Sequence, residues 1–170
     1  MNNKEEDKEL LLQDLCARLP YEVKVSVNGG KEPWTLKGMF DGEHTSMMLI
    51  LEPSFSSKDV SPKTSNWQLS QCKPYLRPLS SMTEEEARDI AILHGNEAKD
   101  ILSIKVTDEY IDIILDDGVC SIITSTIWYD EIVSSVECLD LLNKKMFDYR
   151  GLIPKGLAIA VTKENNPYEN

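Results

Sequence analysis

The stretch Lys73-Pro74-Tyr75-Leu76-Arg77-Pro78-Leu79-Ser80-Ser81-Met82-Thr83-Glu84-Glu85-Glu86 decides how the chain is organised. It follows a region rich in short expected strands, contains two prolines and ends at the start of an expected helix. Thr83 and Glu86 have the spacing of a capping box, in which a hydroxyl and a carboxylate bind backbone N–H groups at a helix start. The stretch therefore predicts two blocks, 1–81 and 82–170, as two small domains or one compact two-part domain.

The first block predicts an N-terminal helix followed by a small antiparallel sheet or barrel. The helix is expected from Glu5 to Leu19, with a stripe of leucines at helical spacing: Leu11, Leu12, Leu15 and Leu19. Alternating apolar residues predict a strand over Tyr21 to Val27, before a turn at Asn28-Gly29-Gly30. A second strand is expected to begin at Trp34 and to close at Asp41-Gly42. Two more strands are expected over Thr45 to Leu51 and over Trp67 to Cys72, with a polar loop over Glu52 to Asn66 between them.

The second block predicts a helix–antiparallel sheet–helix unit, so the fold class is α+β. Ala87, Ile90 and Ala91 give the first helix an apolar face, and Gly95 suits its end. Three strands are expected at Ile101 to Val106, Tyr110 to Leu115 and Val119 to Thr124, with a hairpin turn at Asp116-Asp117-Gly118. Ser134 and Glu137 predict a second capping box. A short strand at Leu157 to Val161 and a frayed tail at Asn165 to Asn170 complete the expectation.

Charge is distributed unevenly along the chain. The net charge is −11, of which residues 1–81 carry −1 and residues 82–170 carry −10. An acidic half repels phosphate backbones, so direct nucleic-acid binding is disfavoured. The same charge favours solubility, and it can attract a basic protein or imitate nucleic acid.

The location expected from the sequence is the cytoplasm. The four cysteines form no C-x-x-C pair, which is typical of reduced thiols. The N-terminus has no apolar signal core, and no apolar run is long enough to cross a bilayer, so we expect no membrane association.

Residues that commonly carry chemistry are sparse, so we assign no catalytic residue, cofactor site or metal site. His44 and His94 are the two histidines, and both are expected at surface positions beside a turn and a helix end. No common zinc, serine-hydrolase, P-loop or Rossmann motif is present. Ser70 and Lys73 have S-x-x-K spacing, but Pro74 disfavours a helix at Lys73, so the match is interpreted as chance.

The thiols and the clustered carboxylates are also interpreted structurally. Cys120 and Cys138 have no base or positive group beside them in the sequence, so they are expected as small core residues. A carboxylate-rich set falls on the expected hairpins: Asp108, Glu109, Asp112, Asp116 and Asp117. Because Asp112 alternates with Ile111 and Ile113, it belongs to a solvated face, and a turn of this kind needs no metal ion.

Aromatic and arginine residues provide the candidate interaction surface. An arginine beside aromatic rings can stack on a partner or hold a carboxylate. The alternative is that the rings complete the edge of the core while the arginine pairs with a carboxylate of the acidic half. The candidate residues are Tyr75, Arg77, Trp128, Tyr149 and Arg150.

Three stretches carry a resemblance to a known group of proteins. They are Leu10 to Tyr21 (LLLQDLCARLPY), Lys73 to Glu86 (KPYLRPLSSMTEEE) and Phe147 to Ile153 (FDYRGLI). In this order they resemble an uncharacterised family from gut bacteria, often encoded near prophage or other mobile-element genes. The resemblance implies a cytoplasmic accessory protein and supplies no catalytic residues. The Ser/Lys-rich stretch from Phe55 to Thr64 looks like an insertion relative to that pattern.

These observations predict a non-enzymatic protein-interaction or accessory factor of mobile-element origin, with an unidentified protein partner. The alternative is an enzyme or a small-ligand-binding module whose site lies in a groove between the two halves. The sequence leaves the oligomeric state open.

Overall fold

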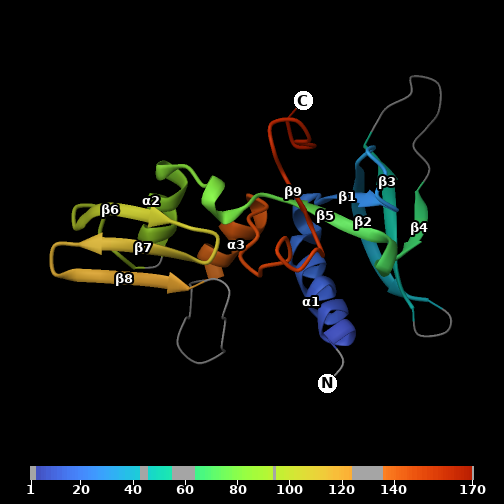
Figure 1. Ribbon diagram of the computed structural model, residues 1–170, viewed down its shortest axis with the longest axis horizontal. Coiled ribbons are helices and arrows are strands. Elements are labelled where there is room, and N and C mark those ends of the chain that lie inside the picture. Colours follow the sequence, from blue (N-terminus) through green and yellow to red (C-terminus); the bar gives the residue numbers. More distant parts are fainter. Residues whose placement is uncertain (1–2, 43–45, 55–63, 94, 124–135, 170) are drawn as a thin grey trace. The chain divides into compact units, whose positions relative to one another are not determined.

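The computed structural model describes residues 3–42, 46–54, 64–93, 95–123 and 136–169, which form two compact units (Figure 1). Unit 1 consists of Met1–Leu76 together with Leu152–Asn170, and unit 2 is Arg77–Gly151. Unit 2 is thus inserted into unit 1 along the sequence. The division expected from the sequence placed residues 152–170 in the second unit, whereas the structure packs them with the first. Whether the units are separate folding domains stays a prediction.

Unit 1 begins with helix α1, Asn3–Arg18, which confirms the predicted N-terminal helix. A 3₁₀ turn, Leu19–Tyr21, follows it and contains Pro20, which cannot continue an α-helix. The buried side of α1 differs from the predicted leucine stripe: Leu12 and Leu19 are only half-buried, and the buried positions are Leu11, Asp14, Leu15 and Arg18. A salt bridge between Asp14 and Arg18 allows two charged side chains to replace leucines on this side.

A six-stranded sheet forms the rest of unit 1. Its spatial order is β4-β3-β2-β1-β5-β9, with antiparallel neighbours except for the parallel pair β5–β9. The strands are β1 (Lys24–Val27), β2 (Trp34–Asp41), β3 (Met47–Pro53), β4 (Ser65–Gln68), β5 (Cys72–Leu76) and β9 (Ile159–Ala160). The sheet is open, with β4 and β9 at its edges. The predicted α+β fold with a sheet is therefore confirmed, and the predicted alternative of a small barrel is wrong.

The segment that leads to Pro74 was predicted incorrectly. The expected strand Trp67 to Cys72 is instead split by a 3₁₀ turn, Leu69–Gln71, and the chain re-enters the sheet as β5. Pro74 therefore lies inside a strand, where a missing N–H is normally unfavourable. It is tolerated because β9 pairs only with Tyr75 and Leu76, so Pro74 has a strand neighbour on the β1 side alone.

The C-terminal residues are held more firmly than the predicted frayed tail. The Tyr168 hydroxyl donates a hydrogen bond to the Tyr75 carbonyl oxygen at 2.8 Å and accepts one from the Lys24 backbone N–H at 3.1 Å. Burial raises the pKa of this phenol well above its ordinary value, so the hydroxyl keeps its proton. Tyr168 thereby connects β1, β5 and the C-terminal segment.

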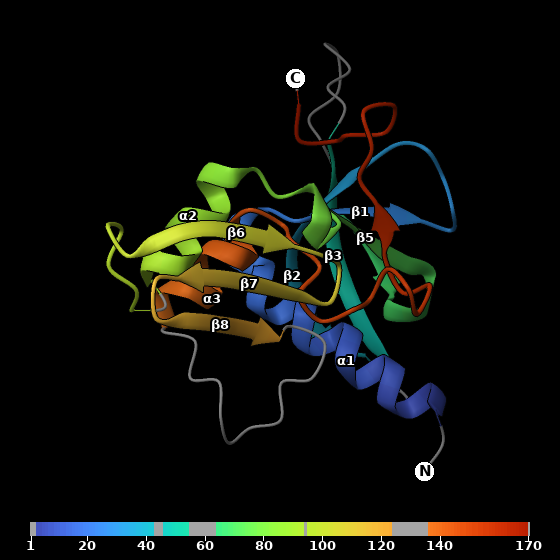
Figure 2. The same cartoon turned by 60° about the vertical axis from the view of Figure 1, so that its left-hand side comes forward.

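Unit 2 has the predicted helix–antiparallel sheet–helix order. The elements are α2 (Glu84–Leu93), β6 (Ile101–Val106), β7 (Tyr110–Leu115), β8 (Gly118–Ile123) and α3 (Val136–Lys144). Residues Asp116 and Asp117 form the predicted two-residue turn, because Leu115 pairs with Gly118 across the hairpin. The two helices lie behind the three-stranded sheet in Figure 2 and bury a common core with it.

Several predictions fall outside the described residues. They concern His44, His94, Trp128, the first residue of the second expected capping box, Ser134, and most of the expected loop and insertion, 55–63. Among the described residues, no helix combines the length and apolar character needed to cross a membrane.

Candidate functional site

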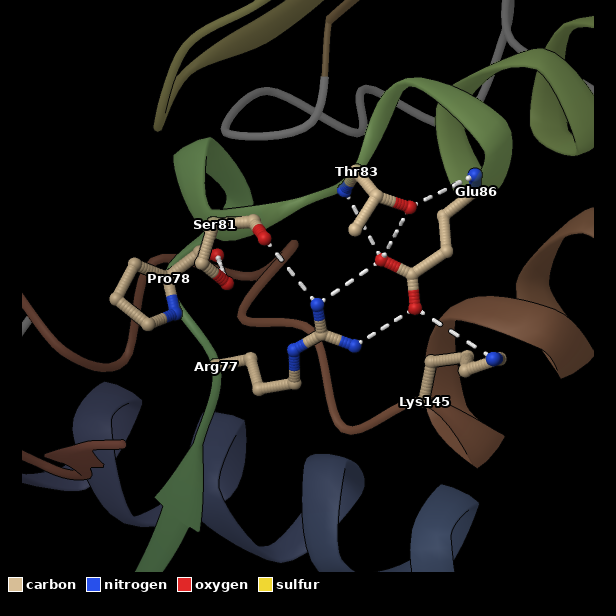
Figure 3. A network of polar contacts seen from close by, with 6 residues as sticks. All are labelled: Arg77, Pro78, Ser81, Thr83, Glu86 and Lys145. Atoms are coloured by element: carbon tan, nitrogen blue, oxygen red, sulfur yellow. Dashed lines mark hydrogen bonds and ion pairs between the residues drawn. The ribbon is translucent and has the colours of Figure 1, made fainter. Parts of the chain in front are cut away.

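Arg77 is the centre of a polar network in unit 2 (Figure 3). Its guanidinium donates two hydrogen bonds to the Glu86 carboxylate, at 2.8 and 2.9 Å, and a third to the Ser81 carbonyl oxygen at 3.2 Å. It also lies over the Phe147 ring, 4.2 Å from the ring centre. Because the fork of donors fits one carboxylate, this arginine is engaged within unit 2.

Glu86 also belongs to the predicted capping box. Its carboxylate accepts a hydrogen bond from the Thr83 backbone N–H at 3.0 Å, and its own N–H donates to the Thr83 hydroxyl at 3.2 Å. Burial raises the pKa of this carboxyl, but hydrogen bonds from Arg77 and Thr83 and the charges of Arg77 and Lys145 outweigh burial and lower it to about 2. The capping box is confirmed, and it is tied to the arginine that precedes the helix.

The backbone around Arg77 explains why this residue is positioned so firmly. Its N–H donates to the Met146 carbonyl oxygen at 2.7 Å, and its own carbonyl accepts from the Asp148 N–H at 2.8 Å. Arg77 and Phe147 form an isolated parallel bridge. The first residue of unit 2 is thus paired with the loop that ends the unit.

The other candidate interaction residues have different surroundings. Tyr75 and Tyr149 are 5% and 1% exposed, so their rings fill the cores of units 1 and 2 respectively. The Tyr149 hydroxyl donates to Asn143 Oδ1 at 3.0 Å and accepts from Arg150 Nε at 3.2 Å. Arg150 is half-buried, and Trp128 lies outside the described residues. The expected role of these residues in partner binding stays a prediction.

The thiols and carboxylates show no arrangement suited to chemistry within the described residues. Burial raises the pKa of Cys72 to about 12 and that of Cys138 to about 11, so both thiols are protonated at neutral pH. Cys138 is a core residue, as predicted, and Cys120 packs against the same core. No group of three or more histidine, cysteine or acidic side chains in this part of the chain is placed to share a metal ion.

The outer face of the unit 2 sheet is a surface that the sequence interpretation missed. We define it as the face turned away from α2 and α3. The strand register places on it Leu102, Ser103, Lys105, Tyr110, Asp112, Ile114, Val119 and Ser121. Leu102 and Val119 are 61% and 63% exposed, which is unusual for large apolar side chains on neighbouring parts of one sheet.

Strand register explains how these apolar residues come together. Ser103, Ile114 and Val119 lie in one row across the three strands, and a bulge between Ile101 and Ser103 places Leu102 beside that row. Leu102 directly follows Ile101 in the expected strand, and this pair of adjacent apolar residues is the sequence signal that could have revealed the exposed surface. Two adjacent apolar residues in a half-buried strand cannot both face the core unless the strand is irregular.

Comparisons of the chain with protein-family models, with curated proteins and with solved structures found no match.

Proposed function

We propose that this protein is a non-enzymatic interaction factor that binds a basic protein partner through the outer face of the unit 2 sheet. The observation that carries the proposal is that Leu102 and Val119 are exposed on this face beside the half-buried Ile114, and we call these three residues the apolar row. Apolar residues grouped on one exposed face are typical of protein interaction sites. An accessory role of mobile-element origin is part of this proposal and rests on the sequence resemblance.

The charges around the apolar row favour a basic partner. Unit 2 holds sixteen acidic and seven basic residues, a net charge of −9. Exposed aspartates adjoin the row along the chain: Asp100 precedes β6, and Asp116 and Asp117 form the turn before Val119. A second copy of this chain would bring two acidic rims together, whereas lysines and arginines around an apolar patch would complement them.

Local contacts occupy the polar half of the same face. The Asp112 carboxylate accepts a hydrogen bond from the Ser121 hydroxyl at 2.5 Å, and Lys105 Nζ donates to the Tyr110 hydroxyl at 3.4 Å. The positive charge of Lys105 is therefore held beside the Tyr110 ring. The apolar row and its aspartates remain the part of the face best suited to a partner.

Burial argues against thiol catalysis at two of the four cysteines, Cys72 and Cys138. A catalytic cysteine needs a thiolate at neutral pH, and burial opposes ionisation of both Cys72 and Cys138. The alternative of a shared enzyme site or ligand site between the two halves stays a prediction.

The proposal can be tested with peptides of defined chemistry. The probes are an amphipathic Leu/Lys peptide, a Ser/Lys peptide of equal charge and a Leu/Glu peptide, with binding measured by fluorescence anisotropy. We expect the Leu/Lys peptide to bind, since it alone supplies both an apolar face and positive charge. Equal affinity for the Leu/Glu peptide would contradict the proposal.

Matched variants locate the surface. The change L102S/V119S should weaken binding of the Leu/Lys peptide by roughly tenfold, because it removes part of the apolar area that a partner would bury. The control is Val136→Ser in α3, which also removes an exposed valine from unit 2 but lies outside the sheet. Equal loss in V136S would overturn the assignment of the surface, as would unchanged binding by L102S/V119S.

A further inference from the structure

A hollow of about 390 Å³ opens on unit 1, where α1 meets the turn before β5. Its floor is apolar: Leu11, Leu69 and Cys72 line it and are 6%, 2% and 2% exposed. Because burial holds the pKa of the Cys72 thiol at about 12, this side chain is neutral and adds to the apolar surface. Leu157, close to β9, lines the hollow from the C-terminal segment.

The rim of the hollow is cationic. Lys4 and Lys8 lie one helical turn apart on α1, and Lys73 lies on β5. All three side chains are exposed, and none takes part in a salt bridge seen among the described residues. Asp7 also lines the hollow, but Lys155 lies 3.6 Å from its carboxylate and offsets its charge.

We propose that this hollow binds a small amphiphilic anion, with an apolar body over Leu11, Leu69 and Leu157 and a negatively charged head group beside Lys4, Lys8 and Lys73. Three lysines around an apolar floor are a local departure from the charge of the whole chain, which is −11. An anion bound in the hollow would be attracted by all three positive charges. The site belongs to unit 1 and does not depend on the function proposed for unit 2.

The shape of the site favours a free small molecule over a membrane surface. A concave hollow of about 390 Å³ falls within the range of roughly 300–1,000 Å³ that is typical of small-molecule sites. Such a volume accommodates the body of a medium-chain ligand, whereas a bilayer surface would meet mainly the exposed lysines.

The first experiment tests the chemical class of the ligand. Decanoate, decanol and acetate are titrated into the full chain by isothermal calorimetry, since decanol lacks the charge and acetate lacks the apolar body. We expect decanoate to bind at least tenfold more tightly than either, and to weaken as salt is added. Equal binding of decanol would overturn the role of the lysines, and equal binding of acetate would overturn the role of the apolar floor.

A second experiment uses decyl phosphate and anionic phosphatidylglycerol vesicles to distinguish a free soluble anion from a lipid in a membrane. Decanoate or decyl phosphate should bind as single molecules, and the vesicles should bind no more strongly than neutral phosphatidylcholine vesicles. Preferential binding to the anionic vesicles, without binding of either soluble anion, would overturn the proposal of an enclosed ligand.

A charge-neutralising variant locates the site. K8Q/K73Q should weaken decanoate binding by roughly tenfold, because two nearby positive charges are lost. The control, K31Q/K99Q, removes the same charge from two other exposed lysines and should bind as the wild type does. Backbone amide shifts on adding decanoate should centre on Leu11, Leu69 and Leu157. Shifts confined to unit 2, or equal losses in both double variants, would contradict the proposal.

Discussion

Arg18 in unit 1 and Arg77 in unit 2 each donate two hydrogen bonds to a carboxylate, yet their surroundings differ. Arg18 binds Asp14 at 2.8 and 2.9 Å within one helix, and both side chains are 0% exposed. Arg77 binds Glu86 from outside the helix that carries Glu86, and the two side chains are 25% and 14% exposed. Ion pairs of similar geometry can therefore differ in how much stability is lost when one partner is removed, because water still stabilises part of the second pair.

The two arginines also differ in what they organise. Arg18 ends α1 and allows a charged pair to lie on the buried side of that helix. Arg77 joins the entry of unit 2 to its exit, through backbone bonds to Met146 and Asp148 and through contact with Phe147. A variant at Arg18 should therefore affect the core of unit 1. A variant at Arg77 should affect the pairing between the first and last segments of unit 2.

The largest effect is expected from Arg18→Met. It leaves the buried Asp14 carboxyl without the two Arg18 hydrogen bonds, which should lower the free energy of unfolding by about 3–5 kcal/mol. Urea denaturation followed by circular dichroism measures this change. The control is D14L/R18M, which removes both charges and should recover most of the loss. If R18M is as stable as wild type, the buried pair does not carry the stability inferred for it.

Arg77→Met should have a smaller effect, of roughly 1–3 kcal/mol, which is the range for losing charge-assisted hydrogen bonds. Glu86 keeps the Thr83 hydrogen bond and the nearby Lys145, and part of its side chain reaches water. The measurement is the same denaturation series. A loss equal to that of R18M would remove the distinction between the two ion pairs.

The pH dependence of unit 2 follows from the lowered pKa of Glu86. This pKa is about 2 in the folded chain, against an ordinary value of 4.5, so the folded state favours the ionised carboxylate. Its stabilisation is fully present above about pH 4.5 and is lost as the pH falls towards 2. The difference in stability between wild type and E86Q should therefore shrink over this interval. A difference that stays constant down to pH 2 would contradict the assignment.

Thr83→Ala tests the capping half of the same network. Removing the hydroxyl takes away the acceptor for the Glu86 backbone N–H, which should cost about 1 kcal/mol. Thr83→Ser keeps the hydroxyl and serves as the matched control. An unchanged denaturation midpoint in T83A would show that the ion pair alone holds the start of α2.

Arg150→Ala should have the smallest effect, about 0.5–1.5 kcal/mol, because Arg150 is half-buried and the hydrogen bond from its Nε goes to the neutral Tyr149 hydroxyl. A thermal melt measures the change, and Arg150→Lys shows whether charge alone suffices. A melt of R150A that overlays wild type would instead favour the interpretation of Arg150 as a contact residue. Loss of more than 3 kcal/mol would place it with Arg18 as a core charge.

Local patterns determined much of this protein. The capping box at Thr83 and Glu86, the hairpin turn at Asp116-Asp117 and the positive-φ turn at Asn28 and Gly29 each depend on a few neighbouring residues. The periodicity of apolar residues likewise predicted α1, α2 and the three strands of unit 2. Such features follow from hydrogen bonds and backbone preferences that act over a few positions, so the sequence alone indicates them.

Tertiary structure decided which of these local elements meet. Pro74 is tolerated in a strand because the neighbouring β9, from the far end of the chain, is too short to pair with it on that side. Asp14 and Arg18 are buried although both are charged residues, and Tyr168 was anchored by backbone groups of β1 and β5. A bulge between Ile101 and Ser103 leaves both Leu102 and Ser103 on the outer face. Each outcome depends on contacts between segments distant in sequence, and no local propensity encodes those contacts.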